Sequence, residues 1–123
     1  MRNTESAEMY LESILVLSQK QGAPRAIDVV HHTGYSKPSV SRAMGLLKKN
    51  GNIIIDENGC IILTEQGRET ANKILERHRV LSGFLRKIGV DDETASEDAC
   101  RIEHVISDTS FEKLKAFLHT DIQ

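Results

Sequence analysis

Three residues near the C-terminus carry side chains that bind transition metals. Cys100, Glu103 and His104 offer a thiolate, a carboxylate and an imidazole. Residues three and four positions apart share one face of an α-helix, so a helix over residues 91–108 would align these donors for a single ion. A helix can carry Glu and His at this spacing by chance, but the added cysteine makes chance a poorer explanation. The pattern predicts a site for a divalent transition metal.

Other residues could complete that site or form a second one. Met9 falls on the polar side of an amphipathic helix predicted over residues 5–20, where it either packs under another helix or supplies a thioether ligand. Glu12 and His78 could together form a second site, although a histidine on an apolar helix face is more often a core residue. Cys60 has no His or Cys close by in the sequence and is interpreted as a small strand residue.

Charge is distributed unevenly along the chain. Residues 25–51 contain five basic residues and one acidic residue, a local charge of +4, although the whole chain has a net charge of −2. Residues 91–108 contain seven acidic residues and one basic residue, a local charge of −6. The basic segment could contact DNA phosphates and the acidic segment could bind cations. Solvated surfaces would give the same pattern, so charge alone does not decide between these interpretations.

The elements around the basic segment predict a winged helix-turn-helix. A helix over residues 26–32, a glycine turn and a helix over residues 36–50 capped by Ser36 form the helix-turn-helix pattern. Two isoleucine-rich runs on either side of Asn58-Gly59 predict a β-hairpin. A hairpin that directly follows a recognition helix is a wing.

The first turns of a recognition helix reach base edges in the major groove. Ser39 and Ser41 can donate hydrogen bonds to phosphates, and Arg42 can reach a guanine. Lys48 is also expected near phosphates. The predicted DNA-contacting residues are Arg25, Ser36, Lys37, Pro38, Ser39, Ser41, Arg42 and Lys49.

The remainder of the chain predicts helices and no catalytic apparatus. A long helix is expected from Thr64 to about Ile88 with Gly67 as a weak point, followed by the acidic helix and a short helix over residues 110–119. No nucleophile–base pair, phosphate-binding loop or HExxH motif is present. With two cysteines, no signal-peptide core and no apolar stretch of membrane-spanning length, the chain is expected to be cytoplasmic and neither an enzyme nor a membrane protein.

These residues and motifs together resemble the diphtheria toxin repressor family of metal-dependent regulators, which includes iron-dependent repressors and manganese transport regulators. The resemblance covers nearly the whole chain, and its most specific part is the metal motif around Cys100. Four segments carry it: Glu8-Met9-Tyr10-Leu11, Ser36 to Ser41, Glu76-Arg77-His78-Arg79 and Asp98 to Asp108.

The resemblance implies a mainly α fold with a small β-hairpin. A winged helix-turn-helix over residues 1–70 would be followed by a helical dimerisation domain over residues 71–123, in the short form that lacks the SH3-like domain of iron-type members. Ser82 and Ser96 stand where iron-type members carry ligands of an ancillary site. The iron-type primary site is matched by Met9, Cys100, Glu103 and His104, and second-site ligands of the manganese type are matched by Glu12 and His78.

The chain is therefore expected to be a metal-dependent transcriptional repressor that controls metal homeostasis. It would bind double-stranded operator DNA as a homodimer formed mainly by residues 89–120, with Phe111 and Phe117 on the dimer surface. Fe²⁺ is the expected metal, with Mn²⁺, Co²⁺, Ni²⁺ and Zn²⁺ as alternatives, and no small organic substrate is expected. The competing interpretations are a winged-helix regulator that responds to an organic ligand or a protein, and a metalloenzyme or metal carrier.

Overall fold

The computed structural model describes residues 3–122, which divide into two compact units between Lys73 and Ile74. The division falls within the long helix α4 (Glu65–Lys87). The domain boundary expected from the sequence lies three residues earlier, after residue 70. Among residues 3–122, no helix is both long enough and apolar enough to cross a membrane.

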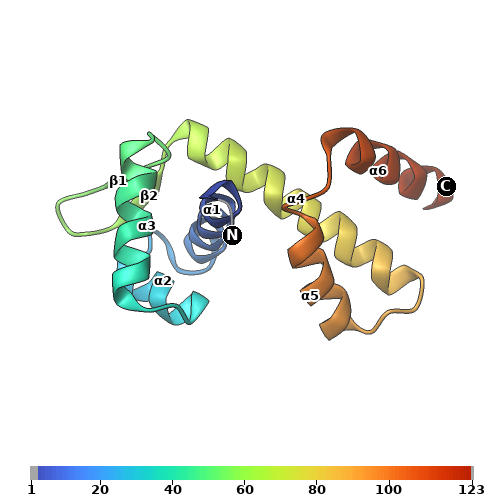
Figure 1. Cartoon of the computed structure of the whole chain (residues 1–123), viewed down its shortest axis with the longest axis horizontal. Coiled ribbons are helices and arrows are strands. Elements are labelled where there is room, and N and C mark those ends of the chain that lie inside the picture. The colour runs from blue at the N-terminus through green and yellow to red at the C-terminus, as the bar shows by residue number, and fades with distance from the viewer. Residues whose placement is uncertain (1–2, 123) are drawn as a thin grey trace. The chain divides into compact units, whose positions relative to one another are not determined.

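The first unit is a winged helix-turn-helix (Figure 1). Helices α1 (Asn3–Gln21), α2 (Ala26–Thr33) and α3 (Lys37–Lys49) pack against one another, and α3 leads into an antiparallel hairpin of β1 (Ile53–Ile55) and β2 (Ile61–Leu63). These elements confirm the predicted fold class. Their shared core is built from large apolar side chains, among them Leu11, Ile14, Leu15, Val29, Val40, Leu47, Ile53 and Ile61.

Local signals determine where α3 begins. The Ser36 hydroxyl accepts a hydrogen bond from the backbone N–H of Ser39 at 3.2 Å, and Pro38 occupies the first turn, where no N–H is needed. Gly34 closes the preceding turn with a φ of 78°, in the left-handed region that favours glycine. The predicted inward stripe of α3 is buried, and it consists of Val40, Met44 and Leu47.

The start of α4 packs closely on the segment that leads into β1. The Thr64 hydroxyl accepts a hydrogen bond from the backbone N–H of Gly67 at 3.2 Å and donates one to the carbonyl of Gly51 at 2.7 Å. A Cβ atom at Gly67 would lie 2.0 Å from the carbonyl oxygen of Asn52. The expectation that Gly67 weakens this helix is therefore wrong, because glycine is the residue that permits the close approach.

The second unit consists of the remainder of α4 together with α5 (Asp92–Ile102) and α6 (Asp108–Ile122) (Figure 1). Asp91 caps α5, and its carboxylate accepts a hydrogen bond from the backbone N–H of Thr94 at 3.0 Å. The pKa of Asp91 lies below its ordinary value, mainly because of the hydrogen bond from the backbone of Thr94 and secondly because of one from the Thr94 side chain.

The single helix expected over residues 91–108 is wrong at its C-terminal end. The chain leaves the helix after Ile102, and α6 begins at Asp108. Two long-range hydrogen bonds account for the break, because Arg77 on α4 donates to the carbonyls of Glu103 at 3.2 Å and Ile106 at 2.7 Å. A local signal also contributes, since the Ser107 hydroxyl accepts a hydrogen bond from the backbone N–H of Ser110 at 3.1 Å in the first turn of α6.

Arg77 is a buried cation that joins α4 to the start of α6. Its side chain also pairs with the carboxylate of Asp108. The guanidinium carbon lies 5.4 Å from the centre of the Phe111 ring, which is a cation–π distance. Phe111 is buried, so its expected place on a dimer surface is wrong.

Candidate metal centre and DNA-binding surface

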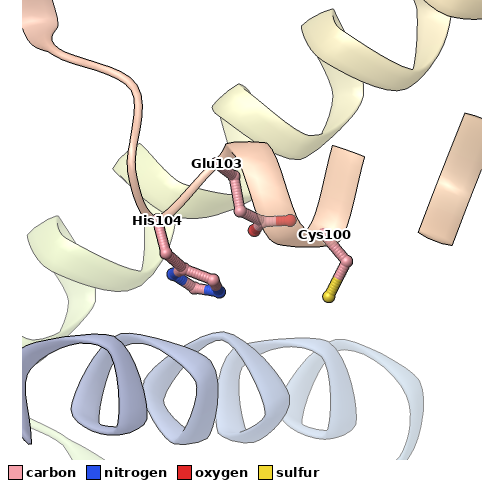
Figure 2. Close-up of side chains that lie close together, drawn as sticks. All are labelled: Cys100, Glu103 and His104. Carbon is pink, nitrogen blue, oxygen red and sulfur yellow. The ribbon is translucent and has the colours of Figure 1, made fainter. Parts of the chain in front are cut away.

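The thiol, carboxylate and imidazole predicted as metal ligands lie together at the end of α5. One donor atom each from Cys100, Glu103 and His104 lies within 4.8 Å of the other two, and Figure 2 shows the three side chains extending toward the same space. Although α5 ends at Ile102, Glu103 keeps helical backbone angles of −58° and −27°. The alignment inferred from residue spacing is therefore retained one residue beyond the helix.

Glu103 is the unusual member of this group because its side chain is 0% exposed. One carboxylate oxygen, Oε1, lies 2.8 Å from Nδ1 of His78 on α4. The other, Oε2, is buried and has no hydrogen-bond partner within the described part of the chain. An ionised carboxylate is costly to bury without a partner, and a bound cation would supply one.

The donor set fits a divalent transition metal in chemistry and in spacing. Metal–ligand bonds of about 2.0–2.3 Å place donors of a tetrahedral site about 3–4 Å from one another. Separations below 4.8 Å therefore need only small side-chain rotations to reach that spacing. Cys100 is exposed whereas Glu103 is buried. The candidate site therefore has a solvent-accessible thiol on one side and an enclosed carboxylate on the other.

His78 has a role that sequence spacing did not indicate. The sequence predicts that His78 is either a core histidine or, with Glu12, a second-site ligand. In the structure it contacts Glu103, a residue 25 positions away, and nothing local in the sequence signals this pairing. A hydrogen bond to one carboxylate oxygen orients the other one, as groups around a metal site commonly do.

The remaining predicted metal ligands, Met9 and Glu12, lie on α1 in the first unit and are half-buried. The Ser13 hydroxyl donates to the carbonyl of Met9 at 3.0 Å and also lies 3.9 Å from the Met9 sulfur. Both assignments as metal ligands remain predictions.

Most of the predicted DNA contacts lie on the exposed side of α3. Lys37, Pro38, Ser41, Arg42 and Lys49 are exposed, and Ser39 is half-buried. The hydroxyls of Ser36 and Ser39 lie 3.0 Å apart and bond to each other at the start of the helix, so their first role is to cap α3.

Arg25 lies along the wing rather than on α3. Its backbone forms an antiparallel bridge with Cys60, and its guanidinium nitrogen Nη2 would lie 3.3 Å from a Cβ atom at Gly59. The wing turn contains Asp56 and Glu57. Negative charge there opposes contact with phosphates, which leaves α3 as the main basic surface of the unit.

Comparisons with known proteins agree with this architecture. The family model described as "Iron dependent repressor, metal binding and dimerisation domain" matches residues 64–120. A helix-turn-helix transcriptional regulator of Methanocaldococcus jannaschii is 36% identical over 117 residues, which is 94% of each chain. The transcriptional regulator MntR of Bacillus subtilis is 32% identical over 111 residues, covering 90% of this chain and 78% of MntR.

The chain belongs to the diphtheria toxin repressor family of metal-dependent transcriptional regulators. The solved structure of the manganese regulator SloR matches with a TM-score of 0.82 and 26% identity, over 92% of this chain and 53% of SloR. This chain thus spans about half the length of that structure. In this chain the winged helix-turn-helix comes first, and residues 64–120 match the model that is described as a metal-binding and dimerisation domain.

Proposed function

We propose that this regulator is a repressor that binds double-stranded operator DNA as a homodimer in the cytoplasm when a divalent transition metal occupies the site of Cys100, Glu103 and His104. The observation that carries the proposal is the fully buried Glu103 carboxylate, which shares one oxygen with His78 and has an unpartnered second oxygen within the described residues. A bound cation would neutralise a charge that the fold otherwise encloses at a cost.

Donor chemistry favours iron over manganese at this site. A thiolate at Cys100 is a soft ligand, whereas Mn²⁺ favours carboxylates and water. Affinity order alone would place Co²⁺, Ni²⁺ and Zn²⁺ above Fe²⁺, so iron is proposed from the resemblance of Met9, Cys100, Glu103 and His104 to the iron-type primary site and from the availability of iron in the cytoplasm. Met9 is proposed as a further soft ligand, and Glu12 with His78 as second-site ligands of the manganese type.

Metal and DNA binding would be linked reciprocally. A metal that raises operator affinity must itself bind more tightly when the operator is bound, and coupling of about 1–3 kcal/mol corresponds to about 5–150-fold in affinity.

Within a dimer the two recognition helices would read half-sites about 34 Å apart. Arg42 is proposed to read a base edge and Lys49 to contact phosphate. Arg42→Ala should then relax sequence preference, and Lys49→Ala should weaken binding to all duplexes alike.

Two exposed apolar side chains support the proposal that the second unit forms the dimer. Val105 is 69% exposed and Phe117 is 64% exposed, although both are large apolar residues. The matching family model covers these positions and is described as a dimerisation domain.

The test is the metal dependence of DNA affinity. The reduced full chain is first used to select a binding sequence from random duplexes with Fe²⁺ present and without oxygen. Fluorescence anisotropy then measures affinity for that duplex with Fe²⁺, Mn²⁺, Co²⁺, Ni²⁺, Zn²⁺ or a chelator. We expect a metal-dependent gain of about 5–150-fold that is lost in Glu103→Gln and reduced in Cys100→Ser.

Cys60→Ser is the matched control, because it removes the chain's other cysteine and leaves the proposed ligands intact. It should retain the full response to metal. Equal affinity with metal and with chelator would contradict the proposed function. Full activation of the Cys100→Ser variant by Fe²⁺ would show that Cys100 is not a metal ligand.

A further inference from the structure

A cavity of about 440 Å³ opens in the first unit between α1 and α3. Its size falls within the range of about 300–1,000 Å³ that is typical of small-molecule sites. All of its lining residues lie between positions 6 and 50, so the cavity belongs entirely to the winged helix-turn-helix unit. One of its lining residues is Met9, which is proposed above as a metal ligand.

The wall of the cavity is mainly apolar and aromatic. The rings of Tyr10 and Tyr35 meet edge to face, with centres 6.1 Å apart and planes at 61°. Leu47 is buried, whereas Leu46 is 54% exposed on a helix whose other exposed side chains are mostly polar. Edge-to-face rings and exposed leucine offer surface for a flat apolar group.

Arg42 is the one charged residue among the described residues that line the cavity. Burial raises the pKa of the Tyr10 phenol most, the Tyr35 phenol raises it further, and the positive charge of Arg42 lowers it against both effects. No acidic residue lines the cavity within the described part of the chain. The cavity thus presents a cation beside aromatic walls and offers it no carboxylate.

We propose that this cavity binds a small aromatic carboxylate, with its ring against Tyr10, Tyr35 and Leu46 and its carboxylate paired with Arg42. A planar guanidinium binds a carboxylate through two parallel hydrogen bonds. A neutral apolar ligand would desolvate the guanidinium without compensation. Inorganic phosphate would leave the aromatic walls uncovered. Because Arg42 is also the proposed base-reading residue, the ligand and DNA would use the same side chain.

The composition of the chain allows a direct test. The protein contains two tyrosines and no tryptophan, and both tyrosines line the cavity. The full chain labelled with 3-fluorotyrosine therefore gives ¹⁹F resonances that report on this cavity alone. The labelled, metal-free protein is titrated with 2-naphthoate and, separately, with the neutral analogue 2-naphthamide.

We expect 2-naphthoate to shift both resonances with saturation and to bind at least tenfold more tightly than 2-naphthamide. Charge-assisted hydrogen bonds imply that Arg42→Gln weakens naphthoate binding by about 10–100-fold and leaves naphthamide binding unchanged. Lys49→Gln is the matched control, because it removes a positive charge from the same helix outside the cavity. Its affinity for naphthoate should equal that of the parent. A second variant, Ala43→Leu, fills the cavity and should abolish binding of both compounds.

Three results would overturn the proposal. The first is that neither resonance moves at millimolar 2-naphthoate. The second is equal affinity for the acid and the amide, and the third is equal loss in Arg42→Gln and Lys49→Gln. Because the titration contains neither metal nor DNA, its failure would leave the proposed metal-dependent repression untouched.

Discussion

Replacing Arg77 with methionine should destabilise the second unit strongly. The Arg77 side chain is buried, with 8% of its surface exposed, and it donates two hydrogen bonds to carbonyls between α5 and α6. Hydrogen bonds from a charged donor contribute about 1.5–3 kcal/mol each. Its ion pair adds less than about 1 kcal/mol, because the Asp108 side chain is 70% exposed. Since these contacts share one side chain and are not additive, we expect a loss of about 3–5 kcal/mol.

The assay is urea denaturation of the metal-free protein, combined with native-state hydrogen exchange resolved by peptide. Arg77→Met should accelerate exchange in residues 99–112 more than in α1 to α3, because the lost contacts lie in the second unit. Arg77→Lys keeps the charge but not the two-pronged geometry, so a smaller loss of about 1–3 kcal/mol is expected. Arg79→Met is the matched control, because Arg79 is exposed on the same helix, and it should change stability by less than about 0.5 kcal/mol. A loss below about 1 kcal/mol in Arg77→Met, or equal losses in both methionine variants, would refute the proposed role of Arg77 in holding α4 to the start of α6.

Three further predictions follow from the structure. Gly67→Ala should lower the free energy of unfolding, measured by thermal denaturation, by about 1–3 kcal/mol, because the new Cβ would meet the carbonyl oxygen of Asn52. Gly45→Ala should raise that free energy by about 0.5–1 kcal/mol, because no atom lies within 4 Å of the new Cβ. Equal effects of the two substitutions would contradict the close packing at Gly67. In Tyr35→Phe, ultraviolet absorbance titration reads Tyr10 alone, whose pKa should lie above its ordinary value of 10.0 because the site is buried. Because the pKa of Tyr10 is raised in the folded state, the contribution of Tyr10 to stability is present below about pH 10 and is lost as pH rises through the folded-state pKa. An unshifted pKa would contradict the burial of the Tyr10 phenol. Phe117→Glu should convert a dimer into a monomer in light scattering, and an unchanged mass would place the interface elsewhere.

Local signals made most of the fold predictable. The serine cap and Pro38 defined the start of α3, and the Asn58-Gly59 turn defined the hairpin. The helix over residues 5–20 corresponds to α1, which extends from Asn3 to Gln21. These features depend on residues close together in the sequence, so their physical causes can be recognised without the fold. The Ser107 cap of α6 is a local signal of the same kind.

The metal centre was only partly predictable, for a physical reason. Donors spaced by three and four residues can be recognised from helix geometry alone, and Cys100, Glu103 and His104 lie together as expected. The break after Ile102 depends on Arg77, and the orientation of Glu103 depends on His78. Those partners are at least 25 positions away, and no local pattern encodes them.

The most direct test of the proposed metal centre is titration of the reduced protein with Co²⁺ under anaerobic conditions, followed by near-ultraviolet and visible absorbance. A Co²⁺ ion bound by a cysteine thiolate gives a sulfur-to-cobalt charge-transfer band, and binding should strengthen as pH rises near neutrality because the thiol must lose its proton. The account predicts a saturable band that is absent in Cys100→Ser and Glu103→Gln and preserved in Cys60→Ser. A band that persists in Cys100→Ser, or none in the parent protein, would contradict it.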